Sequence, residues 1–287
     1  MKHLEKRLFN ISKQNRLLNK KSPIAIFDSG IGGLTVAKKV HMLLPGEKII
    51  YFGDTARVPY GTKSPETIRQ YAIQITSFLI KFKPKLIVIA CHSVSSLGKK
   101  FLENRFNTYH FIDVINPSIE EAIKITKNKK IGVIGTPATI SSERYPEIIK
   151  RIDRKICVYQ AACPLLVPLV EEGWIDGDVI EAVLRYYISD LLKKQIDTLI
   201  LGCTHYPMLK RAIKKITGNS VHLVDASDAT AKKVKTFMIQ NTLLNSSKEK
   251  FPTLYYSDLP EYRKKIMNNF WKTDGFVIKK VNIEKEL

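Results

Sequence analysis

Short aliphatic runs recur along the chain, and most are followed by a polar or glycine-rich turn and a longer amphipathic segment. Such runs are typical of parallel strands buried on both faces, and the amphipathic segments are typical of covering helices. The predicted strands lie at 24–27, 49–52, 86–89, 111–115, 130–134, 156–160, 199–201 and 221–224, with an edge strand at 253–256. The predicted helices include 34–44, 68–81, 116–125 and 179–194. This alternation predicts an α/β protein with a doubly wound parallel architecture.

Two of the predicted strands end in similar sequences. The strand at 86–89 leads into Cys91-His92-Ser93, and the strand at 199–201 leads into Cys203-Thr204-His205. Open α/β sheets bind ligands at the carboxyl ends of their strands, so both cysteines should lie where a ligand binds. Core packing is the alternative for a single free cysteine. The repeated setting, with hydrophilic neighbours each time, favours a functional pair.

The repeated cysteine setting also suggests two α/β halves that face each other across a cleft, and a single large sheet is the alternative. We place the first domain at 23–115 plus 226–287 and the second at 116–225. A basic extension at 1–22 precedes the first strand, and we expect it to be flexible.

Length and cysteine content narrow the class of protein. The 287 residues suffice for one large or two modest α/β domains. No apolar run approaches the roughly 18 residues that cross a bilayer, and the basic N-terminus lacks the apolar segment of a secretory signal. Four cysteines in a chain of this length do not form a disulfide framework, so we expect reduced thiols and a cytoplasmic protein without a membrane partner.

The chain is strongly basic, with a formal net charge of +20. A nucleic acid is one partner that fits such a charge. The lysines are scattered along the whole chain, however, and neither zinc-finger spacing nor an RNA-binding aromatic signature is present. We therefore favour a solvated, lysine-rich surface over a nucleic-acid site.

Polar loops follow the first two predicted strands. The first, 28–33, is a glycine-rich turn between a strand and a helix, and its backbone N–H groups suit a small carboxylate. Thr35 stands where a dinucleotide fingerprint needs its last glycine, so we do not predict a nicotinamide or flavin site. The alternative is a tight turn without a ligand. The second loop, 53–61, is rich in Gly and Pro and is the kind of segment where functional residues gather.

Two thiols on opposite sides of a cleft suggest a particular chemistry. A thiolate is a base as well as a nucleophile, and a nearby cation stabilises the thiolate relative to the thiol. His205 lies two residues after Cys203, and the Asp28 loop is the expected neighbour of Cys91. Two bases on opposite faces of one carbon can remove a proton from one face and deliver one to the other. This is racemisation or epimerisation, with the carbanion stabilised by fixed dipoles and no cofactor.

Two other sites use the same residues. Cys91, His92, Cys203 and His205 offer the sulfur and nitrogen ligands of a zinc site. Adjacent residues of a strand point to opposite faces, though, so Cys91-His92 is a poor ligand pair and we predict no metal. A cysteine hydrolase with His205 as its base is the second alternative, and it leaves the duplicated cysteine without a role.

Taken together, these motifs are recognisable, because the chain resembles glutamate racemase, of the cofactor-independent aspartate/glutamate racemase superfamily. The resemblance runs from about residue 24 to 281 and is carried by the segments 26–36, 51–61, 133–140, 162–173 and 201–207. It implies two α/β domains related by pseudo-twofold symmetry, with the active site between them. It also implies interconversion of L- and D-glutamate without a cofactor, supplying D-glutamate for peptidoglycan and so for cell-wall biogenesis and cell shape. We also expect a homodimer.

By matched position, the resemblance assigns roles to individual residues. Cys91 and Cys203 are the two proton donors and acceptors, and Asp28 and His205 assist them. Glu172 matches an acid of the pocket. The positions that match substrate contacts are Asp28, Ser29, Pro59, Tyr60, Gly61, His92, Ser93, Thr139 and Thr204.

One departure from the family pattern bears on the substrate. The family usually reads Asn-Thr-Ala-Ser after the first cysteine, whereas this chain reads His92-Ser93-Val94-Ser95. A neutral imidazole has one donor and one acceptor and can reproduce part of an amide's bonding, but it is larger and can be charged. His92 therefore leaves open racemisation of a related acid such as aspartate. It also leaves open a racemase-like protein with weak activity and a binding or regulatory role.

Overall fold

The computed structural model describes residues 19–245, 247, 251–272 and 276–286, and most of the predicted extension at 1–22 lies outside them. Parallel strands alternate with helices, as the hydrophobic pattern predicts. The strands are β1 (Ile24–Asp28), β2 (Ile49–Gly53), β3 (Leu86–Ile89), β4 (Phe111–Asp113), β5 (Lys130–Gly135), β6 (Cys157–Ala162), β7 (Thr198–Gly202), β8 (His222–Asp225), β9 (Thr253–Tyr256) and β10 (Val277–Lys280). The α-helices are α2 (Leu34–Leu43), α3 (Pro65–Ile80), α4 (His92–Leu97), α5 (Lys99–Arg105), α6 (Ile115–Ile125), α7 (Pro137–Ser141), α8 (Arg144–Ile152), α9 (Leu166–Glu171), α10 (Asp178–Lys193), α11 (Lys210–Thr217), α12 (Ala226–Gln240) and α13 (Glu261–Phe270).

The first sheet has the strand order β10-β9-β2-β1-β3-β4, and all its pairings are parallel. The central strand β1 is buried along its whole length because helices cover both faces. Ile24 and Ile26 pack with α2 and α12, whereas Ala25 and Phe27 pack with α3. An apolar run without polar alternation is what such a doubly covered strand requires.

The second sheet has the parallel order β6-β5-β7-β8. On one face Ile131 and Val133 pack with α6 and α8, and on the other Leu199 and Leu201 pack with α9, α10 and α11. The fold therefore contains two parallel sheets rather than one large sheet.

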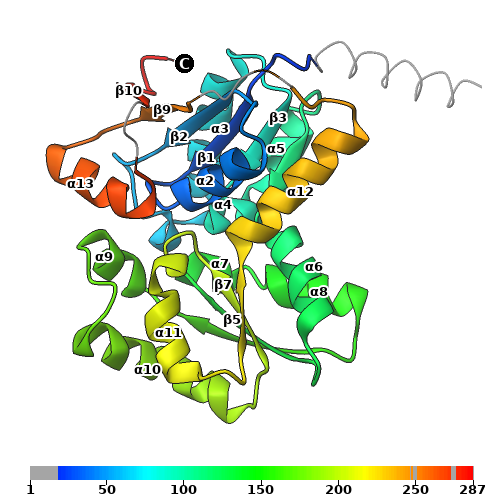
Figure 1. The fold of residues 1–287 in the computed structure, drawn as a ribbon, viewed down its shortest axis with the longest axis vertical. Helices are drawn as coiled ribbons and strands as arrows, with labels where there is room; N and C mark the ends of the chain where they lie inside the picture. Colours follow the sequence, from blue (N-terminus) through cyan, green and yellow to red (C-terminus); the bar gives the residue numbers. More distant parts are fainter. Residues whose placement is uncertain (1–18, 246, 248–250, 273–275, 287) are drawn as a thin grey trace, which may run out of the picture.

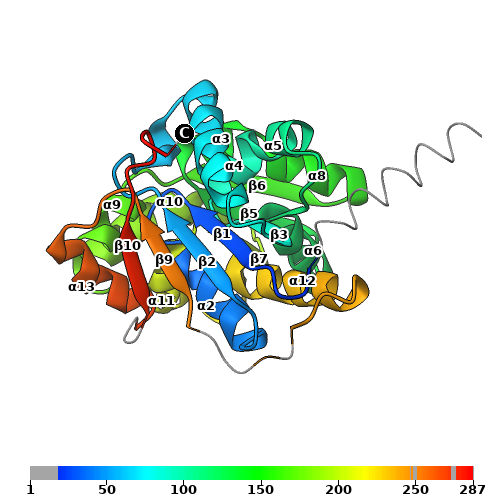
Figure 2. The ribbon, with the colours of Figure 1, turned by 90° about the horizontal axis from the view of Figure 1, so that it is seen from above.

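The two sheets form two lobes, joined by the link from β4 to α6 and by α12, which runs from the second lobe back to the first (Figure 1). We call the β10-β9-β2-β1-β3-β4 sheet with its helices the first lobe, and the β6-β5-β7-β8 sheet with its helices the second lobe. One hydrophobic cluster contains residues of both, including Ile26, Ile134 and Leu201. Seen from above, β10 and β9 extend the first sheet away from the junction and α13 lies beside them (Figure 2).

The structure corrects two of the predicted elements and adds two others. The strand at 253–256 is not an edge strand, because β9 lies between β2 and β10. Strand β4 ends at Asp113, earlier than predicted, because the Asp113 carboxylate accepts hydrogen bonds from the backbone N–H groups of Ile115 and Asn116 and so starts α6. Neither α13 nor β10 was predicted. In the part of the chain described, no helix is long and apolar enough to span a membrane.

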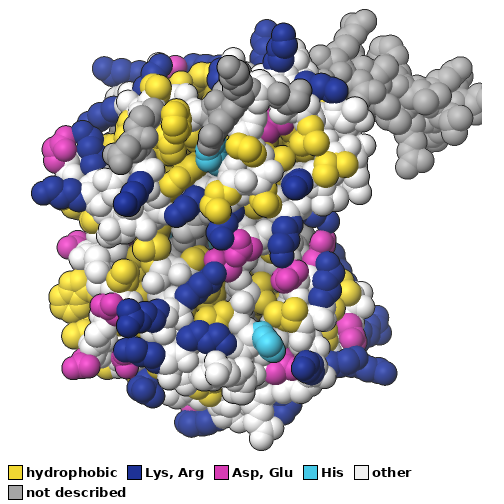
Figure 3. Space-filling model, viewed as in Figure 1, with side chains coloured by type: hydrophobic (Ala, Val, Ile, Leu, Met, Phe, Trp, Pro, Cys, Tyr) yellow, Lys and Arg dark blue, Asp and Glu magenta, His cyan; other side chains and the backbone are white. Residues whose placement is uncertain are grey.

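The Lys and Arg side chains on the face shown in Figure 3 are spread over both lobes and interspersed with acidic ones. Several form ion pairs with neighbouring carboxylates, such as Lys233 with Glu120 and Lys215 with Glu181. On this face the structure agrees with a solvated, lysine-rich surface more than with a single basic patch.

Candidate active site

A cavity of about 320 Å³ lies between the lobes, where the carboxyl ends of strands from both sheets meet. It is lined by Ser29, Val58, Pro59, Tyr60, Gly61, Cys91, His92, Ser93, Thr136, Val167, Cys203, Thr204 and His205. The structure thus brings together both cysteines and most of the side chains expected beside them.

Cys91 follows β3 and occupies the N-cap position of α4. Its thiol donates a hydrogen bond to Ser29 Oγ at 3.6 Å. Burial, reinforced by the nearby Asp28 carboxylate, raises the pKa of Cys91 to about 12. Both effects outweigh the hydrogen bonds from Val94 and Ser29 that favour the thiolate. Cys91 is therefore a thiol at neutral pH.

Asp28 ends β1 and is fully buried. Its Oδ2 accepts hydrogen bonds from the backbone N–H groups of Gly30 and Gly33 at 3.1 and 3.0 Å, and its Oδ1 accepts one from Thr204 Oγ1 at 3.4 Å. Burial raises the pKa of Asp28, although the His205 charge and the backbone donors oppose that rise. The bond to Thr204 ties β1 of the first lobe to the segment after β7 of the second.

The glycine-rich turn differs from its expected use. We expected its backbone N–H groups to hold a ligand carboxylate, but Gly30 and Gly33 donate to the chain's own Asp28. Its glycines are required for close approach: a Cβ on Gly33 would lie 2.4 Å from the Asp28 Cβ, and one on Gly32 would lie 2.6 Å from His205 Nδ1. The turn orients Asp28 and admits the His205 ring.

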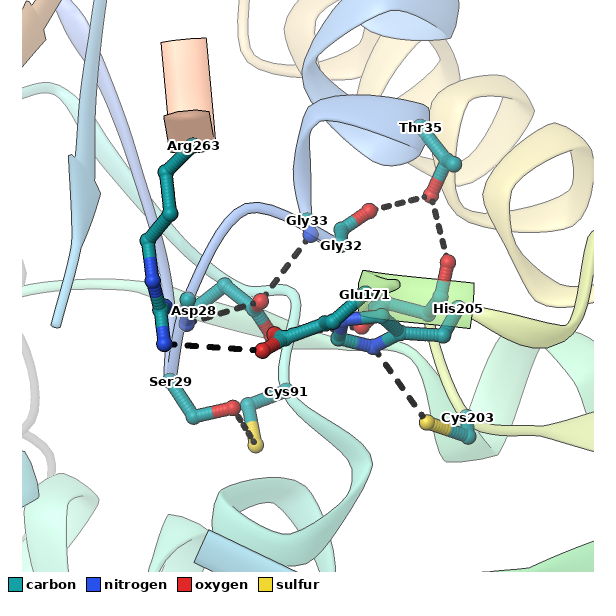
Figure 4. Close-up of polar contacts among 12 residues, drawn as sticks. Asp28, Ser29, Gly32, Gly33, Thr35, Cys91, Glu171, Cys203, His205 and Arg263 are labelled. Carbon is teal, nitrogen blue, oxygen red and sulfur yellow. Dashed lines mark hydrogen bonds and ion pairs between the residues drawn. The ribbon is translucent and has the colours of Figure 1, made fainter. Parts of the chain in front are cut away.

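Cys203 follows β7 and has a different set of partners (Figure 4). His205 Nδ1 lies 3.8 Å from Cys203 Sγ, and His205 Nε2 lies 3.2 Å from Glu171 Oε1. Arg263 Nη2 of α13 lies 3.6 Å from the other oxygen of that carboxylate, Oε2. A series of contacts therefore runs from Arg263 through Glu171 and His205 to the Cys203 thiol.

The charges of His205 and Glu171 follow from their contacts. Burial alone would lower the pKa of His205, but its hydrogen bonds to Cys203 and Glu171 and their charges raise it to about 10. Burial likewise favours the neutral form of Glu171, yet the hydrogen bond and charge of His205 and the charge of Arg263 hold its pKa below the ordinary value. His205 is thus an imidazolium at neutral pH, 3.8 Å from the Cys203 sulfur.

His92 lines the same cavity and is only 3% exposed. Within the described residues, neither Nδ1 nor Nε2 has a hydrogen-bond partner. Burial lowers the pKa of His92 to about 3, so the ring is neutral. A neutral imidazole with one unused donor and one unused acceptor is equipped to bind a polar ligand.

Glu172 was expected to be the pocket acid, and the structure contradicts that position. Glu172 is exposed beyond the end of α9, whereas Glu171 contacts His205. Helical phase explains the difference: Glu171 lies four residues after Val167, which lines the cavity, and Glu172 lies four residues after exposed Pro168. The sequence does not show which face of α9 meets the cavity, so it could not select between the two acids.

The other expected contacts divide into lining and supporting residues. Thr139 is fully buried behind the cavity, with its hydroxyl 3.1 Å from that of Thr136, and Thr136 is the residue of this turn that lines it. Ser93 Oγ contacts the same Thr136 hydroxyl at 3.1 Å across the lobes. The Tyr60 ring lines the cavity while its hydroxyl binds the Asp54 carboxylate.

The zinc alternative requires its ligands to converge. Across residues 19–245, 247, 251–272 and 276–286, no three His, Cys, Asp or Glu side chains are grouped closely enough to share a metal ion. Cys203 instead contacts His205, and Cys91 contacts Ser29.

Comparisons with known proteins agree with this geometry. A family model described as Asp/Glu/hydantoin racemase matches residues 32–234. A glutamate racemase of Chlorobaculum tepidum is 47% identical over 254 residues, which cover 88% of this chain and 93% of that protein. The glutamate racemase of Francisella tularensis, solved in complex with D-glutamate, superposes with a TM-score of 0.88 at 39% identity and covers 93% of this chain and 99% of its own. That of Thermus thermophilus, in complex with β-chloro-D-alanine, has a TM-score of 0.83 at 38% identity, covering 94% and 100%.

Proposed function

The chain belongs to the Asp/Glu/hydantoin racemase family, among its glutamate racemases, and on this premise we propose that it interconverts L- and D-glutamate by proton transfer between Cα and the two thiols Cys91 and Cys203. The observation that supports the proposal most is the unequal pair of thiols in one cavity. Cys203 lies beside an imidazolium, and Cys91 lies beside Asp28 and Ser29. One base that is ready to accept a proton and one acid that is ready to donate are what a two-base racemisation needs.

In this scheme the Cys203 thiolate removes the Cα proton from one face of glutamate, and the electron pair of the C–H bond remains on Cα. The Cys91 thiol then delivers its proton to the opposite face, so the enantiomer forms and the enzyme is left with Cys91 as thiolate and Cys203 as thiol. The reverse reaction restores the first state, and a further turnover in the same direction requires that Cys203 release its proton and that Cys91 take one up from solvent first. Asp28 and His205 assist by exchanging protons with Cys91 and Cys203 and by balancing their charges. The proton inventory closes without a metal or pyridoxal phosphate.

The other side chains that line the cavity bind the substrate or exclude water. We assign Ser29, Ser93, Thr136 and Thr204 hydroxyls to the substrate's carboxylate and ammonium groups, together with the neutral His92 ring. The walls formed by Pro59, Tyr60 and Gly61 exclude water, which strengthens each of these contacts and stabilises the carbanion. Thr139 supports Thr136 from behind.

Three finer statements belong to the same proposal. We propose that the D-glutamate serves peptidoglycan synthesis, as the family resemblance implies. We propose a cytoplasmic enzyme, because both bases must stay reduced and all four cysteines are free. We propose a homodimer, which light scattering of the purified chain tests directly.

Polarimetry of pure L-glutamate and of pure D-glutamate tests the reaction, with a chelator present and without added pyridoxal phosphate. We expect optical rotation to decay to zero from either side, and aspartate at the same enzyme concentration to react at least about tenfold more slowly. A faster reaction with aspartate would reassign the substrate. Stable rotation with every acid would refute the racemase, and salt-sensitive DNA binding in that case would favour a binding role.

A further inference from the structure

Helix α13 reaches the second lobe at the Cys203 side of the site. Figure 1 shows α13 of the first lobe facing α9 of the second. Arg263, Met267 and Phe270 are spaced to share one face of α13. The first contacts Glu171, and the third packs edge-on against the His205 ring with centroids 5.6 Å apart. One helix thus contacts both residues that lie behind Cys203.

The two cysteines differ in where their supporting groups come from. Ser29 and Asp28, which neighbour Cys91, belong to the first lobe together with Cys91 itself. The Glu171–His205 pair and Cys203 belong to the second lobe, but Arg263 contacts the pair from the first. Arg263 therefore contacts the Glu171 carboxylate across the boundary between the lobes, and Figure 4 shows this carboxylate between Arg263 and His205.

We propose that Arg263 is a positioning residue that holds the Glu171 carboxylate against His205 from across the lobe boundary, and so prepares Cys203 as the base. This inference rests on the proposed function, in which Cys203 transfers a proton. Arg263 contacts neither thiol. It acts on Oε2 of Glu171, which leaves Oε1 directed at His205 Nε2.

Loss of Arg263 has two opposite effects on the stability of the His205 imidazolium, one through charge and one through the orientation of Glu171. The charged groups around His205 are Glu171, Asp28, Cys203 and, beyond Glu171, Arg263. Removing a cation from this set would, by charge alone, make the imidazolium more stable. The Glu171 side chain is 17% exposed, so without Arg263 it can rotate to solvent and leave His205 unsupported. The proposal requires that the rotation of Glu171 destabilises the His205 imidazolium by more than the loss of the Arg263 charge stabilises it.

The test measures the alkylation rate of each cysteine by iodoacetamide between pH 5 and 10, with the labelled peptides quantified by mass spectrometry. In Arg263→Met we expect the midpoint of the Cys203 profile to rise by about one pH unit, so that labelling at neutral pH falls about tenfold. The Cys91 profile and that of exposed Cys157 should stay unchanged. In turnover, kcat at pH 7 should fall about tenfold, recover at higher pH and leave KM within about twofold. Arg263→Lys keeps the positive charge and should retain much of the kcat and the Cys203 labelling of the unmodified protein.

Two further variants separate positioning from a general loss of structure. Lys264→Met removes the next charge on α13, which forms an ion pair with Glu261 of the same helix, and should behave as the unmodified protein. In a Glu171→Gln background Arg263→Met should have no further effect, because Arg263 acts through that carboxylate. An unchanged or lowered Cys203 midpoint in Arg263→Met would overturn the proposal, as would an equal effect in the Glu171→Gln background. The labelling profiles need no turnover, so they separate a failure of this inference from a failure of the racemase function.

Discussion

Replacing His92 with leucine should make the free protein more stable and raise the KM for glutamate. Both ring nitrogens of His92 are buried without a partner among the described residues. Leaving a buried polar group unsatisfied costs about 1–3 kcal/mol, whereas an apolar side chain of similar shape avoids that cost. We therefore expect His92→Leu to raise the free energy of unfolding by about 2 kcal/mol at pH 7.5.

The same variant should also change how stability depends on pH. The pKa of His92 is about 3 in the folded state and about 6.5 in the unfolded chain. Between these values the unfolded chain binds a proton that the folded protein does not, so acid destabilises the fold. The loss is about 1.4 kcal/mol per pH unit, or about 2 kcal/mol from pH 6.5 to pH 5. His92→Leu removes it, so the stability gap should widen to about 4 kcal/mol at pH 5.

Urea unfolding at pH 7.5, 6 and 5 measures this gap, and initial rates measure the effect on substrate. KM for glutamate should rise about tenfold or more, because the substrate loses a partner worth about 1.4 kcal/mol or more. His222→Leu is the matched control, since His222 is exposed on β8 and should change neither quantity. If His92→Leu were no more stable at pH 7.5 and followed the same pH slope as the unmodified protein, the ring nitrogens would be paired in the free protein and this reasoning would be refuted.

Three other predictions concern the support of the site and the fold. Gly32→Ala places a Cβ 2.6 Å from His205 Nδ1, so kcat should fall more than about tenfold while circular dichroism stays unchanged. Because the pKa of His205 is about 10, the rate should fall above that pH as the imidazolium beside Cys203 is lost, and a rate profile that stays flat to pH 11 would contradict this. Lys85→Met leaves the buried Glu47 carboxylate without its partner at 2.5 Å and should cost about 3–5 kcal/mol in urea unfolding, which Glu47→Gln in the same chain should partly restore.

The pairing of strands with polar turns could be read from the sequence because it rests on local pattern. Aliphatic runs without alternation identify β1, β3, β5 and β7, and both cysteines directly follow such runs. From this pattern the parallel sheets and the shared cavity could be predicted. The family resemblance added the catalytic reading of Cys91 and Cys203.

What could not be predicted depends on packing between distant segments. Helix α13 is rich in charge and lacks a long apolar stripe, so its contact with Glu171 and His205 leaves little trace in the sequence. The turn at 28–33 looked like an anion site, because sequence alone does not show that its N–H groups are used by Asp28. Whether His92 is paired was equally invisible, since its neighbours come from the three-dimensional arrangement of both lobes.

Exchange of the glutamate Cα hydrogen in deuterium oxide, followed by NMR, tests the two-thiol reaction most directly. The unmodified enzyme should incorporate deuterium from either pure enantiomer and form the opposite one. Cys91→Ala and Cys203→Ala should each abolish racemisation, while each exchanges the Cα hydrogen of only the enantiomer that presents it to the remaining thiol. Full racemisation by either variant, or no exchange by the unmodified enzyme, would contradict proton transfer between Cys91 and Cys203.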